Sequence, residues 1–322
     1  MSEVLAIVAP VFGVVFLGFG AAKLGWFGEQ ATKGLSEFVF TFAIPVLLWR
    51  SLAEAGLPDM IEWGFLISYY GGVALVFLIG VIAAGPLFGA PGPAYGIHGM
   101  ACAFSNTVLL GIPLVLTTFG PDGALPLFMI LTFHGLTLMT MTALTVEIGR
   151  GMTAGSGRET DAWGTVAKVA QSAIIGVVKN PIVGGLLTGL LFAILGWSIP
   201  PGIDGAASLI SQAATPCALF AMGASISRYR LAGEVAPTLW FTAVKLIVHP
   251  LVVYALAAHV FQLEPLWVGV GVLIAAMPVG VNVYLFGQRY RQAEAPAAAA
   301  VLVSTLAAAV TVTAVLSLLD LV

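Results

Sequence analysis

Long unbroken apolar runs dominate this sequence, and they restrict the chain to a membrane fold. Ten such runs lie at about residues 4–24, 35–53, 64–88, 96–119, 124–147, 180–197, 205–227, 236–260, 266–287 and 296–319. At 1.5 Å per residue, a helix of about 20 residues crosses the ~30 Å hydrocarbon core of a bilayer. A transmembrane β-barrel instead needs alternating segments of about ten residues. The runs therefore predict an all-α integral membrane protein with ten transmembrane helices.

The composition excludes most soluble functions. Of the 322 residues, 60% are hydrophobic and 8% are charged, whereas a soluble domain carries about 25% charged residues. A soluble enzyme is therefore excluded, and the net charge of −3 without a basic face excludes a nucleic-acid partner. Cys102 and Cys217 both lie in apolar runs, so no disulfide scaffold is expected. Because the sequence contains no Walker motif, metal-ligand spacing or catalytic constellation, we expect no metal, no cofactor and no enzyme activity.

Basic residues in the loops predict the orientation. Loops after odd-numbered runs contain nine of them, namely Lys23, Lys33, Arg150, Arg158, Lys168, Arg228, Arg230, Arg289 and Arg291. Loops after even-numbered runs contain Arg50 alone. Because Lys and Arg are enriched in cytoplasmic loops, we expect odd loops in the cytoplasm and both termini outside. The first run carries Glu3 and no basic residue before it, so we expect it to remain as a span.

The longest connection between runs has two parts. Residues 149–160 are rich in Gly and Ser, which predicts a flexible cytoplasmic linker. Residues 162–178 place apolar side chains at roughly helical spacing, which predicts an amphipathic helix in the membrane interface. A longer sixth span is the alternative.

The second half of the chain repeats the first at an offset of 171 residues. Without gaps, residues 10–26 and 181–197 share seven of seventeen positions, including the Pro10/Pro181, Gly18/Gly189, Gly25/Gly196 and Trp26/Trp197 pairs. Five runs in each half force the second half to be inverted, which is typical of secondary transporters with a site near the midplane. We therefore predict a first five-helix repeat at residues 1–148, a linker and interfacial helix at 149–179, and a second repeat at 180–322. Chance similarity between apolar helices is the alternative.

Helix-breaking and polar residues interrupt the fourth and ninth runs at matching depth. They are Ser105, Asn106, Gly111 and Pro113 in the fourth run, and Pro278, Gly280 and Asn282 in the ninth. Pro removes a backbone donor and Gly permits unusual dihedrals, so both favour unwound backbone. Two breaks that cross near the membrane centre would turn helix N-termini toward an anion. Ordinary kinks are the alternative.

Lys245 is the basic residue that lies deepest in a predicted span. It stands one helical turn from His249 and about nine residues into the eighth run. Burying a lysine there costs several kcal/mol unless it is paired, deprotonated or hydrated. It is a candidate to pair with an anionic substrate, or to donate to helix C-terminal carbonyls at a break in place of a coupling cation. A neutral or snorkelling lysine is the alternative.

Other polar residues in the runs are weaker candidates. His134, in the fifth run, is either a substrate contact and proton carrier or a hydrogen-bonded packing residue. His249 is a candidate support or proton site. Gln212, in the seventh run, either lines a cavity or bonds a neighbouring helix, and we favour the second role.

The residues 106–114, Asn-Thr-Val-Leu-Leu-Gly-Ile-Pro-Leu, resemble the fourth-span signature of the auxin efflux carrier family. That family includes plant PIN proteins and many bacterial members. Similar matches are Asn180-Pro181, Ala218-Leu219-Phe220, Lys245 before His249-Pro250, and Met277-Pro278. The resemblance implies that spans four and nine cross at Pro113 and Pro278, that spans one, two, six and seven form a scaffold, and that the other spans move as an elevator in a homodimer. Asn106 matches a substrate-contacting Asn, whereas His134 and Gln212 depart from the plant pattern.

Together these observations predict a secondary transporter of a small organic anion, a carboxylate, in a bacterial inner membrane. We expect Ser105, Asn106, His134, Asn282 and Lys245 to bind the substrate, and Gly111, Pro113, Pro278 and Gly280 to form the crossing. The lipid bilayer and a second copy of the chain are the expected partners. An uncoupled anion channel and a transporter-derived membrane sensor are the alternatives.

Overall fold

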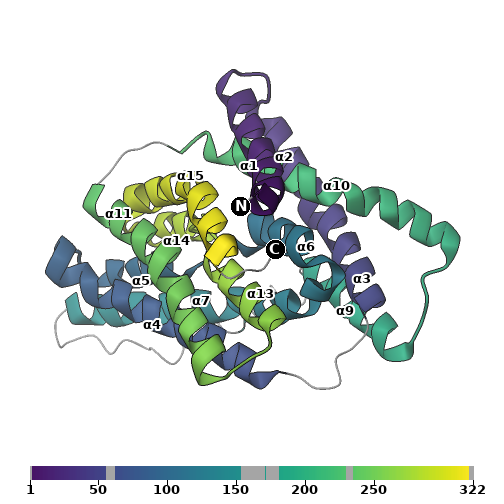
Figure 1. Ribbon diagram of the computed structural model, residues 1–322. Helices are drawn as coiled ribbons and strands as arrows, with labels where there is room; N and C mark the ends of the chain where they lie inside the picture. Colours follow the sequence, from purple (N-terminus) through teal and green to yellow (C-terminus); the bar gives the residue numbers. More distant parts are fainter. Residues whose placement is uncertain (1, 56–61, 154–170, 172–180, 230–234, 319–322) are drawn as a thin grey trace.

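The protein is helical throughout the residues that its computed structural model describes, which are 2–55, 62–153, 171, 181–229 and 235–318 (Figure 1). No β-strand forms in those ranges. Seven stretches there are long and apolar enough to cross a membrane: Val4–Lys23, Glu29–Glu54, Trp63–Phe88, Thr107–Gly151, Pro201–Ile226, Val235–Val260 and Glu294–Leu318. Two shorter apolar helices, Pro181–Leu195 and Pro265–Ala275, lie in the sixth and ninth predicted runs. The all-helical membrane fold is therefore confirmed, while the count of ten spans stays a prediction.

The helices follow the predicted apolar runs closely. The first half contains α1 (Ser2–Lys23), α2 (Glu29–Phe38), η1 (Val39–Ala43), α3 (Ile44–Ala55), α4 (Trp63–Phe88), η2 (Gly92–Ala94), α5 (Tyr95–Ala103), η3 (Thr107–Gly111), α6 (Ile112–Phe119), η4 (Gly120–Gly123) and α7 (Ala124–Thr153). The second half contains α9 (Pro181–Leu195), α10 (Pro201–Ile226), α11 (Val235–Ala243), η5 (Val244–Val248), α12 (His249–Tyr254), η6 (Ala255–Val260), α13 (Pro265–Ala275), α14 (Val281–Tyr290) and α15 (Glu294–Leu318). Helix α7 runs five residues beyond position 148, the predicted end of the first repeat, while the division into two repeats and a linker stays a prediction. The predicted interfacial helix at 162–178 lies outside the described residues except for Gln171.

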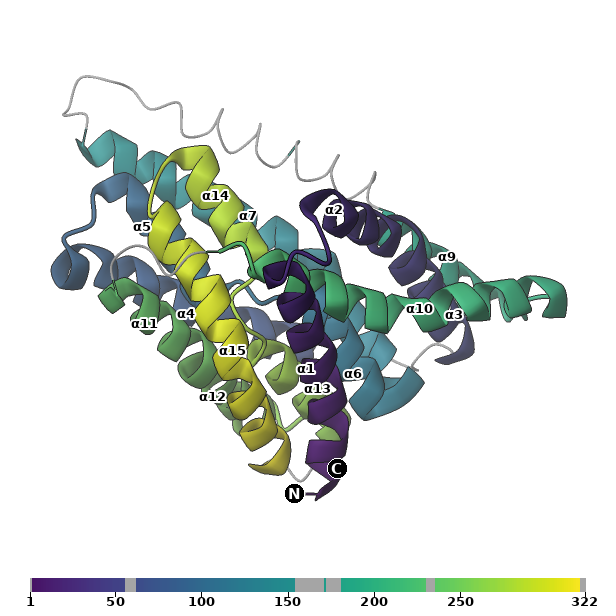
Figure 2. The ribbon, with the colours of Figure 1, turned by 90° about the horizontal axis from the view of Figure 1, so that it is seen from above.

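The helices gather into two groups. α3, α9 and most of α10 lie on one side of the molecule in both views, and α4, α5 and α11 lie on the other (Figures 1 and 2). In the first group α1 packs along α10 and α3 packs along α9. Arg50 of α3 also donates a hydrogen bond from Nε to Asp204 of α10 at 2.7 Å. In the second group α4 packs on α5, α5 on α7, α12 on α13, and α11 and α14 on α15.

Glycines allow the first group to pack with backbone against backbone. A Cβ atom on Gly223 of α10 would overlap the carbonyl of Val15 on α1, and one on Gly18 would overlap the carbonyl of Phe220. Gly189 of α9 meets the backbone of Trp49 on α3 in the same way. Small residues at such contacts let membrane helices approach closely, where van der Waals packing drives their association.

Three π-helical segments precede prolines inside long helices. The prolines are Pro45, Pro113 and Pro250, each two residues after the end of η1, η3 or η5. In each case the residue before the proline donates its N–H five positions back, as Ile112 does to Thr107. The wider turn accommodates the ring and the missing donor, so the helix continues through the proline.

This arrangement corrects the predicted place of the first break. We expected Pro113 to hold the crossing, but Pro113 is buried within α6, seven residues beyond Asn106. The unwound residues are 104–106, between α5 and η3. Because the π turn accommodates Pro113, the break falls at the preceding Ser-Asn pair instead.

Replacing Gly223 by Ala should destabilise the protein, because the new methyl group overlaps the Val15 carbonyl and α1 must move away from α10. Overpacking of this kind costs about 1–3 kcal/mol. Gly13→Ala on α1 is the matched control, since nothing lies within 4 Å of its Cβ position. The melting temperature of purified protein in detergent measures both. A Gly223→Ala variant as stable as Gly13→Ala would contradict the close contact.

Candidate functional site

Two unwound segments cross in the interior and pair through their backbones. Residues 104–106 join α5 to η3, and residues 276–280 join α13 to α14. The N–H of Asn106 donates to the Pro278 carbonyl at 2.8 Å, and the N–H of Gly280 donates to the Phe104 carbonyl at 2.9 Å. Ser105 and Val279 face each other as an antiparallel bridge. Each break thus satisfies backbone groups of the other, which backbone at membrane depth requires.

Side chains from two other helices hold the centre of this pairing. The N–H of Ser105 donates to Nε2 of His134 on α7 at 3.2 Å. The N–H of Val279 donates to Oγ of Ser304 on α15 at 3.0 Å. Ser105 and Val279, the two residues of the bridge, therefore each donate their N–H to a buried side chain of a helix that is not broken. These bonds attach the crossing to α7 and α15 and so fix its position within the second group of helices.

The bonds of His134 define its tautomer. Because Nε2 accepts from a backbone N–H, a neutral imidazole carries its proton on Nδ1. Nδ1 lies 3.4 Å from the hydroxyl oxygen of Tyr69 on α4, which is the matching acceptor. His134 is 2% exposed and also meets the Phe104 ring edge-on at a centroid distance of 4.8 Å. Hydrogen bonds at both nitrogens therefore fix the orientation of the imidazole ring. His134 also lines a cavity.

A cavity of about 460 Å³ lies against the crossing. Its polar lining consists of Ser36, Ser105, Asn106, Thr107, His134, Ser225 and Asn282, and its apolar wall includes Phe40, Phe104, Leu131, Met139 and Leu285. No Lys, Arg, Asp or Glu occurs among the described residues that line it. The first residues of α14, Val281 and Asn282, belong to the lining, so the partial positive charge of that helix start lies at the cavity.

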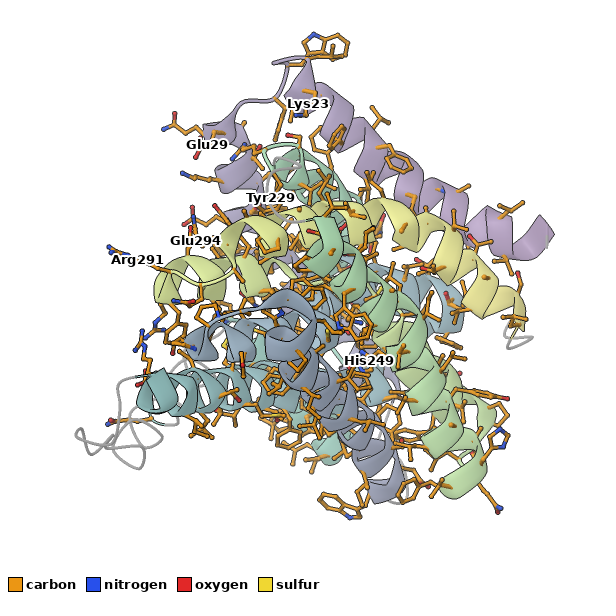
Figure 3. All side chains as sticks on the ribbon, turned by 90° about the vertical axis from the view of Figure 1, so that its left-hand side faces the viewer. Lys23, Glu29, Tyr229, His249, Arg291 and Glu294 are labelled. Carbon is orange, nitrogen blue, oxygen red and sulfur yellow. The ribbon has the colours of Figure 1, made fainter. Side chains whose placement is uncertain are left out.

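The cavity extends toward one end of the molecule. Its lining residues Ser36, Ser225 and Leu285 stand one helical turn from Lys33, Arg228 and Arg289, respectively. Charged residues collect at this end, with Glu29, Arg291 and Glu294 along the same edge, while His249 lies among the helices (Figure 3). The predicted cytoplasmic loops carry these basic residues.

The predicted site residues separate into two sets. Ser105, Asn106, His134, Gly280 and Asn282 come together at the cavity. The Pro278 carbonyl accepts from Asn106 at the crossing. Gly111 is the last residue of η3, and its N–H donates to the Asn106 carbonyl at 3.1 Å. Gln212 does not belong here, because it is an exposed residue of α10 whose amide donates to Ser208 of the same helix.

Lys245 lies behind the cavity rather than in its lining. It is fully buried on η5, and its Nζ donates to the carbonyl of Ala275, the last residue of α13. Lys245 therefore does not line this cavity, and its expected pairing with a substrate stays a prediction, whereas the expected donation to a helix end at a break is observed. His249 is also fully buried, with its ring 6.0 Å from Tyr69, and in the described part of the chain neither of its nitrogens has a hydrogen-bond partner.

Sequence reasoning missed the residues that hold the site from behind. Tyr69 and Ser304 carry no spacing signal, because each reaches the crossing only through tertiary packing. Ser36 and Ser225 lie near the ends of their helices and meet at the cavity only in the fold. Thr107, by contrast, directly follows the predicted Ser-Asn pair.

Comparisons with known proteins identify the family. The sequence model described as "Membrane transport protein" matches residues 3–316. The chain belongs to this family. A protein of Rhizobium meliloti named "Putative malonate transporter" is 27% identical over 320 residues, covering 99% of this chain and 97% of that protein. The "Auxin efflux carrier component 8" of Arabidopsis thaliana is 24% identical over 365 residues, covering 99% and 98%.

A third relative is much longer than this chain. The mouse "Lysosomal cholesterol signaling protein" is 27% identical over 251 aligned residues, covering 74% of this chain and 28% of that protein. The predicted membership of the auxin efflux carrier family is confirmed, and the chain is a membrane transporter of this family. The relatives named as transporters agree with the expectation that it is not an enzyme.

Replacing Ser304 by Ala should destabilise the crossing of the two broken helices, because the buried N–H of Val279 loses its acceptor. An unsatisfied buried donor costs about 1–3 kcal/mol. Thr305→Val is the matched control, since Thr305 donates only within its own helix, to the Val301 carbonyl. Melting temperature in detergent should fall for Ser304→Ala and change little for Thr305→Val. Equal melting temperatures would show that Ser304 does not hold the break.

Proposed function

We propose that this protein is a secondary active carrier of a small organic anion, with the substrate carboxylate bound where the two broken helices cross. The cavity carries the argument. It combines a helix start, the side chains of Asn106, Asn282 and Thr107, and His134 with apolar walls, and it has no carboxylate in its described lining. Neutral donors and helix N-termini are suited to an anion. The name of the rhizobial relative points to the same substrate class.

Ten spans in two inverted five-helix repeats are part of this proposal. Two structural matches at the 171-residue offset support it. Gly25 and Gly196 both have positive φ, at 77° and 61°, just after α1 and α9. The contact of Gly18 with Phe220 has its counterpart in that of Gly189 with Trp49, with the partners exchanged between halves. The boundaries then become residues 1–153 and 181–322, with the linker between them.

We further propose that the two groups of helices are a scaffold and a moving transport body. The scaffold comprises α1, α2 to α3, α9 and α10, which correspond to spans one, two, six and seven of the family pattern. The transport body contains both breaks and the residues that hold them, since His134, Tyr69, Ser304 and Lys245 all come from its helices. An elevator movement would therefore carry the site as a unit. A homodimer through the scaffold follows from the family resemblance.

The orientation is also a proposal. The bias of basic residues supports odd loops in the cytoplasm and both termini outside, in what we propose is a bacterial inner membrane. Because the cavity extends toward Lys33, Arg228 and Arg289, this structure then represents an inward-facing state.

We assign to Lys245 the role of a tethered cation. Unwound carbonyls and helix C-terminal ends hold coupling cations in broken-helix transporters, and the ammonium group of Lys245 occupies such a position at the end of α13. It would stabilise the crossing and add positive charge behind the anion without touching it. His134 and His249 are the candidate proton sites beside it.

Flux measurements distinguish two alternative functions from the proposed carrier. An uncoupled anion channel would give a linear flux without saturation or counterflow. A membrane sensor, favoured by the name of the mouse relative, would bind its ligand without transport.

The test is charge movement and tracer flux in liposomes that contain the purified protein, with monocarboxylates, dicarboxylates, indole-acetate and neutral controls at two pH values. Saturable flux of one anion class with counterflow is expected. If neither current nor tracer counterflow occurs for any anion, the carrier proposal falls.

Asn106→Ala should raise the half-saturating anion concentration, because the carboxylate loses a donor at the crossing. The loss of one hydrogen bond to a charged group is worth about 1.5–3 kcal/mol, or roughly 10- to 100-fold. Gln212→Ala is the control and should transport like the unmodified protein. An unchanged half-saturation in Asn106→Ala would remove Asn106 from the binding site.

Lys245→Met separates a functional charge from a structural one. Met cannot donate to the Ala275 carbonyl, so Lys245→Met should lower the melting temperature about as much as Ser304→Ala, which also removes one hydrogen bond at the crossing. Transport should fall at least about tenfold more than in Ser304→Ala if the ammonium group contributes one charge interaction of about 1.4 kcal/mol. An equal loss of transport in the two variants would show a purely structural role.

A further inference from the structure

A side chain of the scaffold, Met222, accepts a hydrogen bond from a site residue. The Nδ2 group of Asn106 donates to Sδ of Met222 at 3.6 Å, within the range for a sulfur acceptor. Met222 lies on α10 and is fully buried. It does not belong to the described cavity lining, whereas Asn106 does. The amide N–H of Asn106 is therefore turned out of the cavity and onto the scaffold.

The backbone groups of Asn106 are already committed. Its backbone N–H donates to Pro278, and its carbonyl accepts from Gly111. These bonds tie the backbone of Asn106 to the transport body, so the side-chain amide is the part that can change partner by rotation. Because a thioether is a weak acceptor, a substrate carboxylate would replace it easily.

Met222 itself is fixed on the scaffold. The next residue, Gly223, lies against the backbone of Val15, which holds this part of α10 tightly on α1. A movement of the transport body past α10 by more than about 1 Å would take the amide out of hydrogen-bonding range of the sulfur.

From this geometry we propose that Met222 is a latch for the empty carrier. Resting on the proposed elevator movement, it holds Asn106 when no substrate is bound and releases it when a carboxylate takes the amide. An empty carrier that moves must leave a buried N–H without a partner, which is unfavourable. A loaded carrier moves with that N–H bonded to its substrate. Met222 thereby favours exchange of anions over net flux.

The experiment compares two transport modes of the full-length protein in liposomes. Exchange is measured with anion on both sides, and net flux with anion on one side only, using the anion that the unmodified protein transports. Met222→Leu keeps the volume and removes the acceptor. It should raise the ratio of net flux to exchange by about threefold to tenfold, as expected for one weak hydrogen bond. Met129→Leu is the matched control, because Met129 packs on the core from α7 outside the cavity lining and should leave the ratio unchanged.

A second variant should act in the opposite direction. Met222→Gln offers an amide oxygen, a stronger acceptor than sulfur, and should lower the ratio of net flux to exchange. A lower melting temperature for Met222→Leu with an unchanged ratio would show that Met222 only packs, and would overturn the latch. If the unmodified protein transports no anion in either mode, the proposed carrier function is wrong. If it transports an anion and the ratio of net flux to exchange is the same in all variants, only the proposed role of Met222 is wrong.

Discussion

The need to satisfy backbone groups far from water governs the centre of this protein. Two helices stop in the interior, and each leaves N–H and carbonyl groups that lipid could not hydrogen-bond. Two backbone hydrogen bonds between the breaks satisfy four of these groups, one from Asn106 to Pro278 and one from Gly280 to Phe104. Neither helix could unwind alone at this depth, so the two breaks depend on each other. This dependence explains why interruptions occur at matching depth in both halves of the sequence.

The same requirement determines which polar side chains the core contains. His134 and Ser304 accept the remaining N–H groups at the bridge, and Lys245 donates to the end of α13. Each of the three is buried, and each bonds backbone rather than another charged group. These three residues are thus explained first as partners of unwound backbone. Any role in transport is built on positions that the fold already needs.

The sequence predicted what depends on periodicity and local chemistry, and missed what depends on tertiary contacts. The apolar runs predicted the helices within a few residues, and Ser105, Asn106 and Asn282 were found because polar residues interrupt such runs. Pro113 misled the prediction because a π turn accommodates it, and a proline in an apolar run does not by itself distinguish a π turn from a break. Lys245 lies near the breaks, but the direction of its side chain depends on the neighbouring end of α13. Ser304 and Met222 carry no signal at all until α15 and α10 pack beside the crossing.

The charges of the proposed transport body bear on how an anion would move with it. Lys245 is its one fully buried Lys or Arg, and no Asp or Glu is buried among the described residues. With a protonated Lys245, a bound monocarboxylate would make the core of the moving body neutral, whereas the empty body would carry one positive charge. Moving a net charge through a low-dielectric region is costly. Under the proposed mechanism, the cation behind the site and the latch in front of it therefore act in the same direction, since both make the empty carrier harder to move than the loaded one.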